Sequence, residues 1–97
     1  MTHHSIKFED LQNLVDDINI TTGNHLLRYS ERLGIGFSVN IGTYYLEKKN
    51  GFQLLQATAH AGNPVTIGFL TKREMYAILT AYLSGLRAEK KGGYRGV

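Results

Sequence analysis

The sequence predicts an α+β domain in which an N-terminal and a C-terminal helix flank an antiparallel sheet of three or four short strands with a central hairpin. Apolar residues recur at helical spacing near both ends of the chain, and the middle is rich in β-branched and aromatic residues. Asn50-Gly51 stands between two such runs as a hairpin turn. With 97 residues and 42% apolar side chains, the chain has the size and composition of one folded domain.

The first helix is predicted from Phe8 to about Thr22. Acidic residues lie on the side opposite its apolar stripe, which is typical of an amphipathic helix packed on a core. Gly23-Asn24 is a favourable left-handed cap, so we expect the helix to end there. The apolar stripe consists of Phe8, Leu11, Leu14, Val15 and Ile18.

The segment 25–36 mixes apolar and polar residues, and a loop or a short turn of helix is expected there. Residues 36–46 predict one or two strands interrupted at Gly42. Residues 58–63 are expected to form a flexible loop, and residues 65–69 a short further strand.

The central hairpin turns at Asn50-Gly51, which suits the two positive-φ positions of a type I′ turn. If Lys49 pairs with Phe52, Leu46 faces Leu55 and Tyr44 faces Ala57 on one side of the sheet. Tyr45, Phe52 and Leu54 would then lie on the other side.

The second helix is predicted from Lys72 to about Ser84, because Thr71 and Glu74 have the spacing of a capping box. Gly85 is expected to close it. The domain then covers residues 5–86, and residues 87–97, with four cations and one anion, form a flexible basic tail. The predicted apolar stripe is Met75, Ile78, Leu79, Tyr82 and Leu83, and the residues predicted for the core of the whole domain are Leu14, Ile18, Leu46, Leu55, Leu79 and Leu83.

The start of the second helix also suggests an anion site. Lys72 and Arg73 follow Thr71 at an end of the helix where the dipole disfavours cations. Free backbone N–H groups, the dipole and two long cations together suit a phosphate group. We therefore take Thr71, Lys72 and Arg73 as candidate ligand-binding residues.

Four residues elsewhere complete the candidate ligand site. Tyr45 is an aromatic on a sheet face that could stack on a base, while Arg28 and Arg32 could hold phosphate. Packing of the tyrosine at the sheet edge is the structural alternative. His60 lies among small residues in an accessible loop, and an incidental surface histidine is the alternative there.

The sequence does not indicate an enzyme. No serine stands in a nucleophile-elbow context, no phosphate-binding glycine loop occurs, and the chain has no cysteine. The acidic pairs Glu9-Asp10 and Asp16-Asp17 fall on the expected solvent side of a helix. The four histidines, His3 and His4 among them, match no common metal-site spacing, so neither a metal nor a cofactor is expected.

Three segments resemble small phage-encoded proteins of unassigned function, the phage ABA-sandwich domains. They are Asp17-Ile18-Asn19 with Thr22-Gly23, residues 40–46 (Asn-Ile-Gly-Thr-Tyr-Tyr-Leu), and residues 71–76 leading to 81–86. The resemblance covers about residues 8–86. The hairpin Lys48-Lys49-Asn50-Gly51-Phe52 departs from it, since that family has a longer tyrosine- and glycine-rich turn. The resemblance implies a viral origin and a fold, and no activity.

These observations favour a phage-encoded, non-catalytic binding protein, foremost a counter-defence protein that sequesters a small (cyclic) nucleotide immune signal. A stoichiometric protein inhibitor of a host defence system such as CRISPR is one alternative, and a nucleic-acid-binding accessory of phage replication, acting through the basic tail, is another. Homo-oligomerisation is expected because short sheets have edges to protect. No apolar run could span a membrane, so a cytoplasmic location in the host cell is expected.

Overall fold

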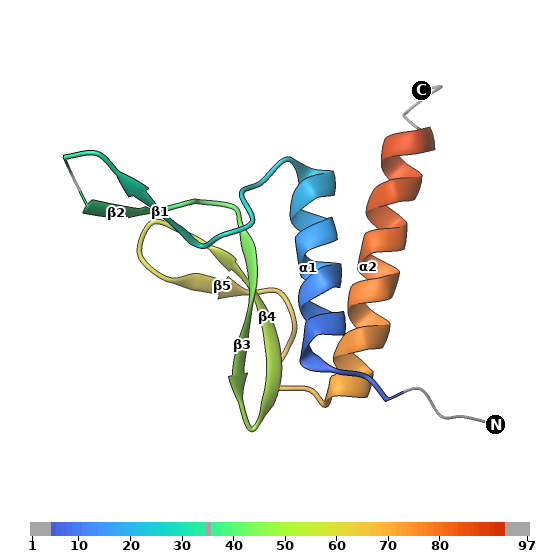
Figure 1. Cartoon of the computed structure of the whole chain (residues 1–97). Helices are drawn as coiled ribbons and strands as arrows, with labels where there is room; N and C mark the ends of the chain where they lie inside the picture. Colours follow the sequence, from blue (N-terminus) through green and yellow to red (C-terminus); the bar gives the residue numbers. More distant parts are fainter. Residues whose placement is uncertain (1–4, 35, 93–97) are drawn as a thin grey trace.

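The computed structural model describes residues 5–34 and 36–92 and has the predicted α+β architecture (Figure 1). Two helices accompany two small antiparallel sheets, one of order β1-β2 and one of order β3-β4-β5. The elements, in chain order, are α1 Phe8–Thr22, β1 Tyr29–Arg32, β2 Gly36–Val39, β3 Tyr44–Lys49, β4 Gly51–Ala57, β5 Gly62–Pro64 and α2 Lys72–Gly92.

Helix α1 begins and ends as predicted. The Lys7 N–H donates to the Asp10 carboxylate at 2.8 Å, which satisfies a free donor at the helix start. Gly23 closes the helix in the left-handed conformation, with φ 76°, and the Asn24 N–H returns to the Asn19 carbonyl at 2.8 Å.

Helix α2 begins as predicted and ends later. Thr71 N–H donates to Glu74 Oε1 at 2.9 Å, and Glu74 N–H donates to Thr71 Oγ1 at 3.1 Å, so the capping box is confirmed. The prediction that Gly85 closes the helix is wrong, because α2 continues to Gly92. Neither helix of the described residues is long and apolar enough to cross a bilayer.

Contacts with α1 stabilise the added turns of α2. Lys90 Nζ donates to the Thr21 carbonyl at 3.1 Å, and Arg87 lies 3.9 Å from the Asp17 carboxylate. Part of the segment predicted to be a flexible basic tail is therefore helical. Residues 93–97 of that tail lie outside the described residues.

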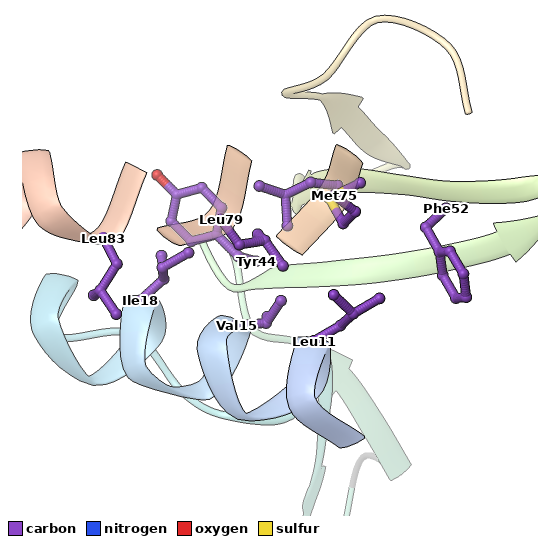
Figure 2. Close-up of a cluster of buried hydrophobic side chains, with 9 residues drawn as sticks. Leu11, Val15, Ile18, Tyr44, Phe52, Met75, Leu79 and Leu83 are labelled. Atoms are coloured by element: carbon purple, nitrogen blue, oxygen red, sulfur yellow. The ribbon is translucent and has the colours of Figure 1, made fainter. Parts of the chain in front are cut away.

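The core lies between the two helices and one face of the β3-β4-β5 sheet (Figure 2). The helices lie side by side, α1 against β3 and α2 against β4. Both therefore cover the same face of this sheet. The buried cluster consists of Leu11, Val15, Ile18, Tyr44, Phe52, Leu54, Met75, Leu79 and Leu83.

The predicted core is confirmed in part. Ile18, Leu79 and Leu83 belong to the buried cluster, while Leu14 and Leu46 pack against it half-buried. Leu55 is also buried, but outside that cluster, because its side chain lies on the opposite face of the sheet.

The hairpin exists, but its predicted register is wrong by one residue. Phe52 pairs with Lys48, not with Lys49, and Leu46 consequently faces Leu54. This shift places Phe52 and Leu54 on the helix-covered face.

The turn of this hairpin is also not the predicted type I′. Gly51 has φ 130°, but no non-glycine residue in the described part of the chain, Asn50 included, has positive φ. The tertiary structure sets the register here, since Phe52 exchanges two backbone hydrogen bonds of 2.7 Å with Leu70, just before α2. The Leu70 carbonyl would lie only 2.7 Å from a Cβ atom at Gly51, so this approach requires glycine.

Two loop assignments also differ. Tyr29–Arg32, inside the segment predicted as loop or helical turn, forms β1. The last strand is Gly62–Pro64 and not residues 65–69. Thr66 Oγ1 instead accepts the Leu54 N–H at 3.1 Å, which ties the segment after β5 to the sheet by a side chain.

Candidate functional site

The hairpin of β1 and β2, which we call the arm, projects from the body on the side away from α2 (Figure 1). Its strands pack extensively on each other, and neither packs extensively on another described helix or strand. In its register Ser30 faces Ser38 and Arg32 faces Gly36. Because side chains alternate across a strand, the arm has two distinct faces.

One face of the arm is polar and internally hydrogen-bonded. Arg32 Nε donates to Ser38 Oγ at 2.8 Å, and Arg32 Nη2 approaches Asn40 Oδ1 at 3.4 Å. The buried Asn40 amide donates to Ser30 Oγ at 2.7 Å and to the Leu27 carbonyl at 2.8 Å. The arm polar face, as we name it, consists of Arg28, Ser30, Arg32, Ser38 and Asn40.

Arg28 joins the base of the arm to the larger sheet. Its guanidinium carbon lies 4.2 Å from the ring centroid of Tyr45 and 5.1 Å from that of Tyr29, which is cation–π geometry. Burial raises the pKa of the Tyr45 phenol above its ordinary value of 10.0, and the Arg28 charge opposes this rise. Arg28 Nε is buried and has no hydrogen-bond partner among the described residues.

The two arginines have only neutral partners. Within the described residues, no carboxylate lies within 4.0 Å of the Arg28 or Arg32 guanidinium. Arg32 is exposed, whereas Arg28 is half-buried and its Nε atom is shielded from solvent. Glu31 lies on the opposite face of β1 by the alternation of the strand. Neither guanidinium is therefore neutralised by an acid, which leaves the charge of both available to an anion.

A groove adjoins this face. It is a cavity of about 550 Å³ between α1 and the segment that leads into β1, and we call it the basal groove. Inside it, Gln12 Nε2 donates to Asp16 Oδ1 at 3.0 Å. The residues lining it are Gln12, Asp16, His25, Leu26, Leu27 and Ser30. Ser30 belongs to both the groove and the arm polar face, so one ligand could occupy both.

The predicted candidate residues thus fall into two groups. Arg28 and Tyr45 are in direct contact, and Arg32 lies at the other end of β1, where it donates to Ser38. His60 lies exposed in the turn before β5, where the Thr58 N–H donates to the Ala61 carbonyl at 2.8 Å. That turn comes close to Tyr45, whose hydroxyl a Cβ atom at Gly62 would strike.

Thr71, Lys72 and Arg73 lie elsewhere, at the start of α2 beside the turn of the β3-β4 hairpin (Figure 1). Both cations are exposed. The Glu74 carboxylate accepts the Thr71 N–H, so this helix start already has an acidic group in place.

Sequence reasoning missed most of the neutral residues of this site. Ser30, Ser38 and Asn40 are not among the predicted site residues, because the sequence does not predict the pairing of residues 29–32 with residues 36–39. The signal was present: Arg28, Ser30 and Arg32 recur with a period of two, which places them on one face once the segment is extended. The groove residues Gln12, Asp16 and His25 carry no such signal, since the groove forms only when the chain after α1 folds back.

The chain matches no family model, no curated protein and no solved structure. The resemblance to phage ABA-sandwich domains therefore stays a prediction. Among the described residues, no three histidine, aspartate or glutamate side chains are grouped so that they could hold a metal ion.

Proposed function

We propose that this protein is a non-catalytic binding protein that sequesters a phosphate-bearing nucleotide at the base of the arm. The observation that carries the proposal is the junction at Ser30, where the basal groove meets the arm, whose two guanidinium groups have no carboxylate partner among the described residues. In this arrangement the phosphate lies on the arm polar face and the base enters the groove.

The arm polar face has the chemistry that phosphate requires. Guanidinium groups bind phosphate oxygens through charge-assisted, often paired hydrogen bonds. Arg32 Nε donates a hydrogen bond to Ser38, and an Nη atom of Arg32 lies near Asn40. These contacts fix the direction of the side chain before any ligand binds. Arg28 is held by stacking on Tyr45 and leaves Nε without a partner among the described residues.

The basal groove has the size and chemistry for a base. Ligand pockets usually measure about 300–1,000 Å³, and the groove of about 550 Å³ falls in that range. Leu26 and Leu27 supply apolar walls. The Asp16 carboxylate, which accepts a hydrogen bond from Gln12, can accept another from an exocyclic amine, and His25 lines the same groove.

The biological setting rests on the family resemblance. A phage-encoded protein of this size that holds a nucleotide without converting it would remove a signal from the host cell, so counter-defence in the host cytoplasm is the role we favour. Cyclic dinucleotides are the first ligands to test, since they combine bases with two phosphates.

Isothermal titration of the protein with cyclic dinucleotides, with the matching nucleosides and with inorganic phosphate tests the proposal. We expect cyclic dinucleotides to bind and the nucleosides, which have no phosphate, to bind far more weakly. Arg32→Gln should weaken binding about 10- to 100-fold, since a charge-assisted hydrogen bond contributes about 1.5–3 kcal/mol. Asp16→Asn should change the preference among bases.

Arg73→Gln is the matched control, because it removes the same charge from an exposed arginine outside the site. If the helix start holds the phosphate instead, Arg73→Gln or the double variant Lys72→Ala/Arg73→Ala will weaken binding and Arg32→Gln will not. A wild-type protein that binds no nucleotide in the panel would end the nucleotide proposal.

A stoichiometric inhibitor of a host defence protein is the second candidate, and the other face of the arm favours it. Phe37 is 73% exposed, Leu33 fully exposed and Tyr29 47% exposed. Exposed apolar side chains gathered on one projecting element are typical of protein-binding surfaces. Binding of a host protein that Phe37→Ala abolishes and Arg32→Gln leaves unchanged would favour this candidate. A nucleic-acid accessory would instead bind oligonucleotides in a salt-dependent manner.

A further inference from the structure

We infer that a second copy of this chain pairs with the arm along the outer edge of β2, in a two-fold antiparallel arrangement that joins two arms into one four-stranded sheet. The order of strands would be β1-β2-β2-β1. Three observations support the inference: the protection of the other edges, the direction of the free backbone groups, and the residues that the pairing brings together.

Natural sheets protect free edges with charges, prolines or very short strands. Both described sheets together have four edge strands, and three of them carry such a device. Strand β1 contains Glu31 and Arg32, β3 has exposed charges over residues 47–49, and β5 has three residues including Pro64. Strand β2 is Gly-Phe-Ser-Val, and the uncharged stretch around it extends from Leu33 to Leu46. It is the one described edge strand that carries neither a charge nor a proline.

The backbone of β2 has free groups in the required direction. Asn40 N–H donates to the Arg28 carbonyl at 2.8 Å, so residues 36, 38 and 40 make the hydrogen bonds to β1. By the alternation of an antiparallel ladder, the N–H and C=O groups of Phe37 and Val39 point away from β1. These four groups are what an added strand would pair with.

A two-fold axis through Ser38 gives all four of these backbone groups a hydrogen-bond partner in the other copy. Phe37 of one copy then faces Val39 of the other in a hydrogen-bonded pair. By symmetry, Val39 of the first copy faces Phe37 of the second in the same way. The pairing makes four backbone hydrogen bonds and places two exposed aromatic rings beside two aliphatic side chains, with no charge on either strand.

The corresponding pairing through the outer edge of β1 brings like charges together in two of its three registers. The outward groups there belong to Tyr29 and Glu31, so a two-fold axis can lie at Ser30, at Glu31 or at Tyr29. An axis at Ser30 places Arg28 opposite Arg32 of the other copy. An axis at Glu31 places Glu31 opposite Glu31 of the other copy. Like charges directly opposite each other destabilise a sheet. An axis at Tyr29 brings no like charges together, so charge disfavours two of the three registers at the β1 edge, whereas β2 has no charged residue in any register.

The pairing also extends the candidate site. A two-fold axis perpendicular to a sheet keeps each face on its own side, so the two arm polar faces become one surface with Arg28 and Arg32 from both copies. If the proposed nucleotide function is correct, this surface suits a ligand with two phosphate groups. The dimer itself does not depend on that function, and its test uses no ligand.

Sedimentation velocity of the full chain without nucleotide, from about 1 to 500 µM, tests the inference, because a short strand pairing is expected to have micromolar affinity. We expect a monomer–dimer equilibrium. Phe37→Pro removes an outward N–H from each copy and should raise the dissociation constant about 10- to 100-fold. Glu31→Pro is the matched control: it removes an outward N–H from β1 and should leave the dimer unchanged.

Amide exchange at Ser30 and Ser38 reports whether the arm stays folded in both proline variants. If Phe37→Pro unfolds the arm, Phe37→Lys replaces it, since a lysine on the edge keeps the backbone donors and blocks strand pairing. The inference is overturned by a wild-type chain that is monomeric throughout, by a dimer that tolerates Phe37→Lys, or by a dimer that Glu31→Pro dissociates with the arm intact.

Discussion

Replacing Asn19 by alanine should destabilise the fold more than any other single polar-to-alanine change on α1. Asn19 is fully buried, and its side chain binds the backbone of Tyr44 at the start of β3. Asn19 Nδ2 donates to the Tyr44 carbonyl at 3.0 Å, and Tyr44 N–H donates to Asn19 Oδ1 at 2.8 Å. This pair of hydrogen bonds attaches the helix to the free edge of the larger sheet.

The magnitude follows from what the substitution leaves behind. Asn19→Ala removes both hydrogen bonds and leaves the Tyr44 N–H and C=O buried without partners. Each such group costs about 1–3 kcal/mol, so the free energy of unfolding should fall by about 2–5 kcal/mol. In a domain of this size, a loss of 2 kcal/mol corresponds to a melting temperature lower by about 8 °C or more.

Urea unfolding followed by circular dichroism measures the effect, with the slope of the transition checked for each variant. Asn13→Ala is the matched control, because Asn13 lies on the same helix and is exposed. It should be neutral or stabilise by a few tenths of a kcal/mol through helix propensity. A loss below about 1 kcal/mol for Asn19→Ala, or equal losses for both variants, would refute the role of the Asn19–Tyr44 pair.

Two further predictions concern the core. Leu79→Ala, at a fully buried position between the helices and the sheet, should lower the free energy of unfolding by about 2–5 kcal/mol, measured by the same urea titration. Burial and the hydrogen bond between the Tyr44 and Tyr82 hydroxyls raise the pKa of Tyr44 to about 12 from 10.0. Above pH 10 the unfolded chain therefore loses this proton first, and stability should fall from pH 10 to 12. Tyr44→Phe should make that part of the pH profile flatter, and an unchanged slope would contradict the assignment.

The sequence by itself determined the elements whose signals are local. The period of apolar residues fixes both helices, since a 3.6-residue repeat can bury one stripe only as a helix. Gly23 and the Thr71–Glu74 pair fix two helix ends, because caps depend on residues three or four positions apart. The Asn50-Gly51 turn also marked the central hairpin correctly, although not its register.

Only the tertiary structure decided the features that depend on distant residues. Leu70 sets the hairpin register by pairing with Phe52, and α1 supports α2 beyond Gly85 through Thr21 and Asp17. The candidate site has the same origin. Arg28 and Arg32 were predicted one by one as ligand-binding residues, but their common face exists because a short segment with little strand signal pairs with β2, far from the core. Strand pairing and burial depend on residues far apart in the chain, so the sequence of a short segment does not decide between a strand and a loop. Helix caps and apolar stripes depend on residues only a few positions apart.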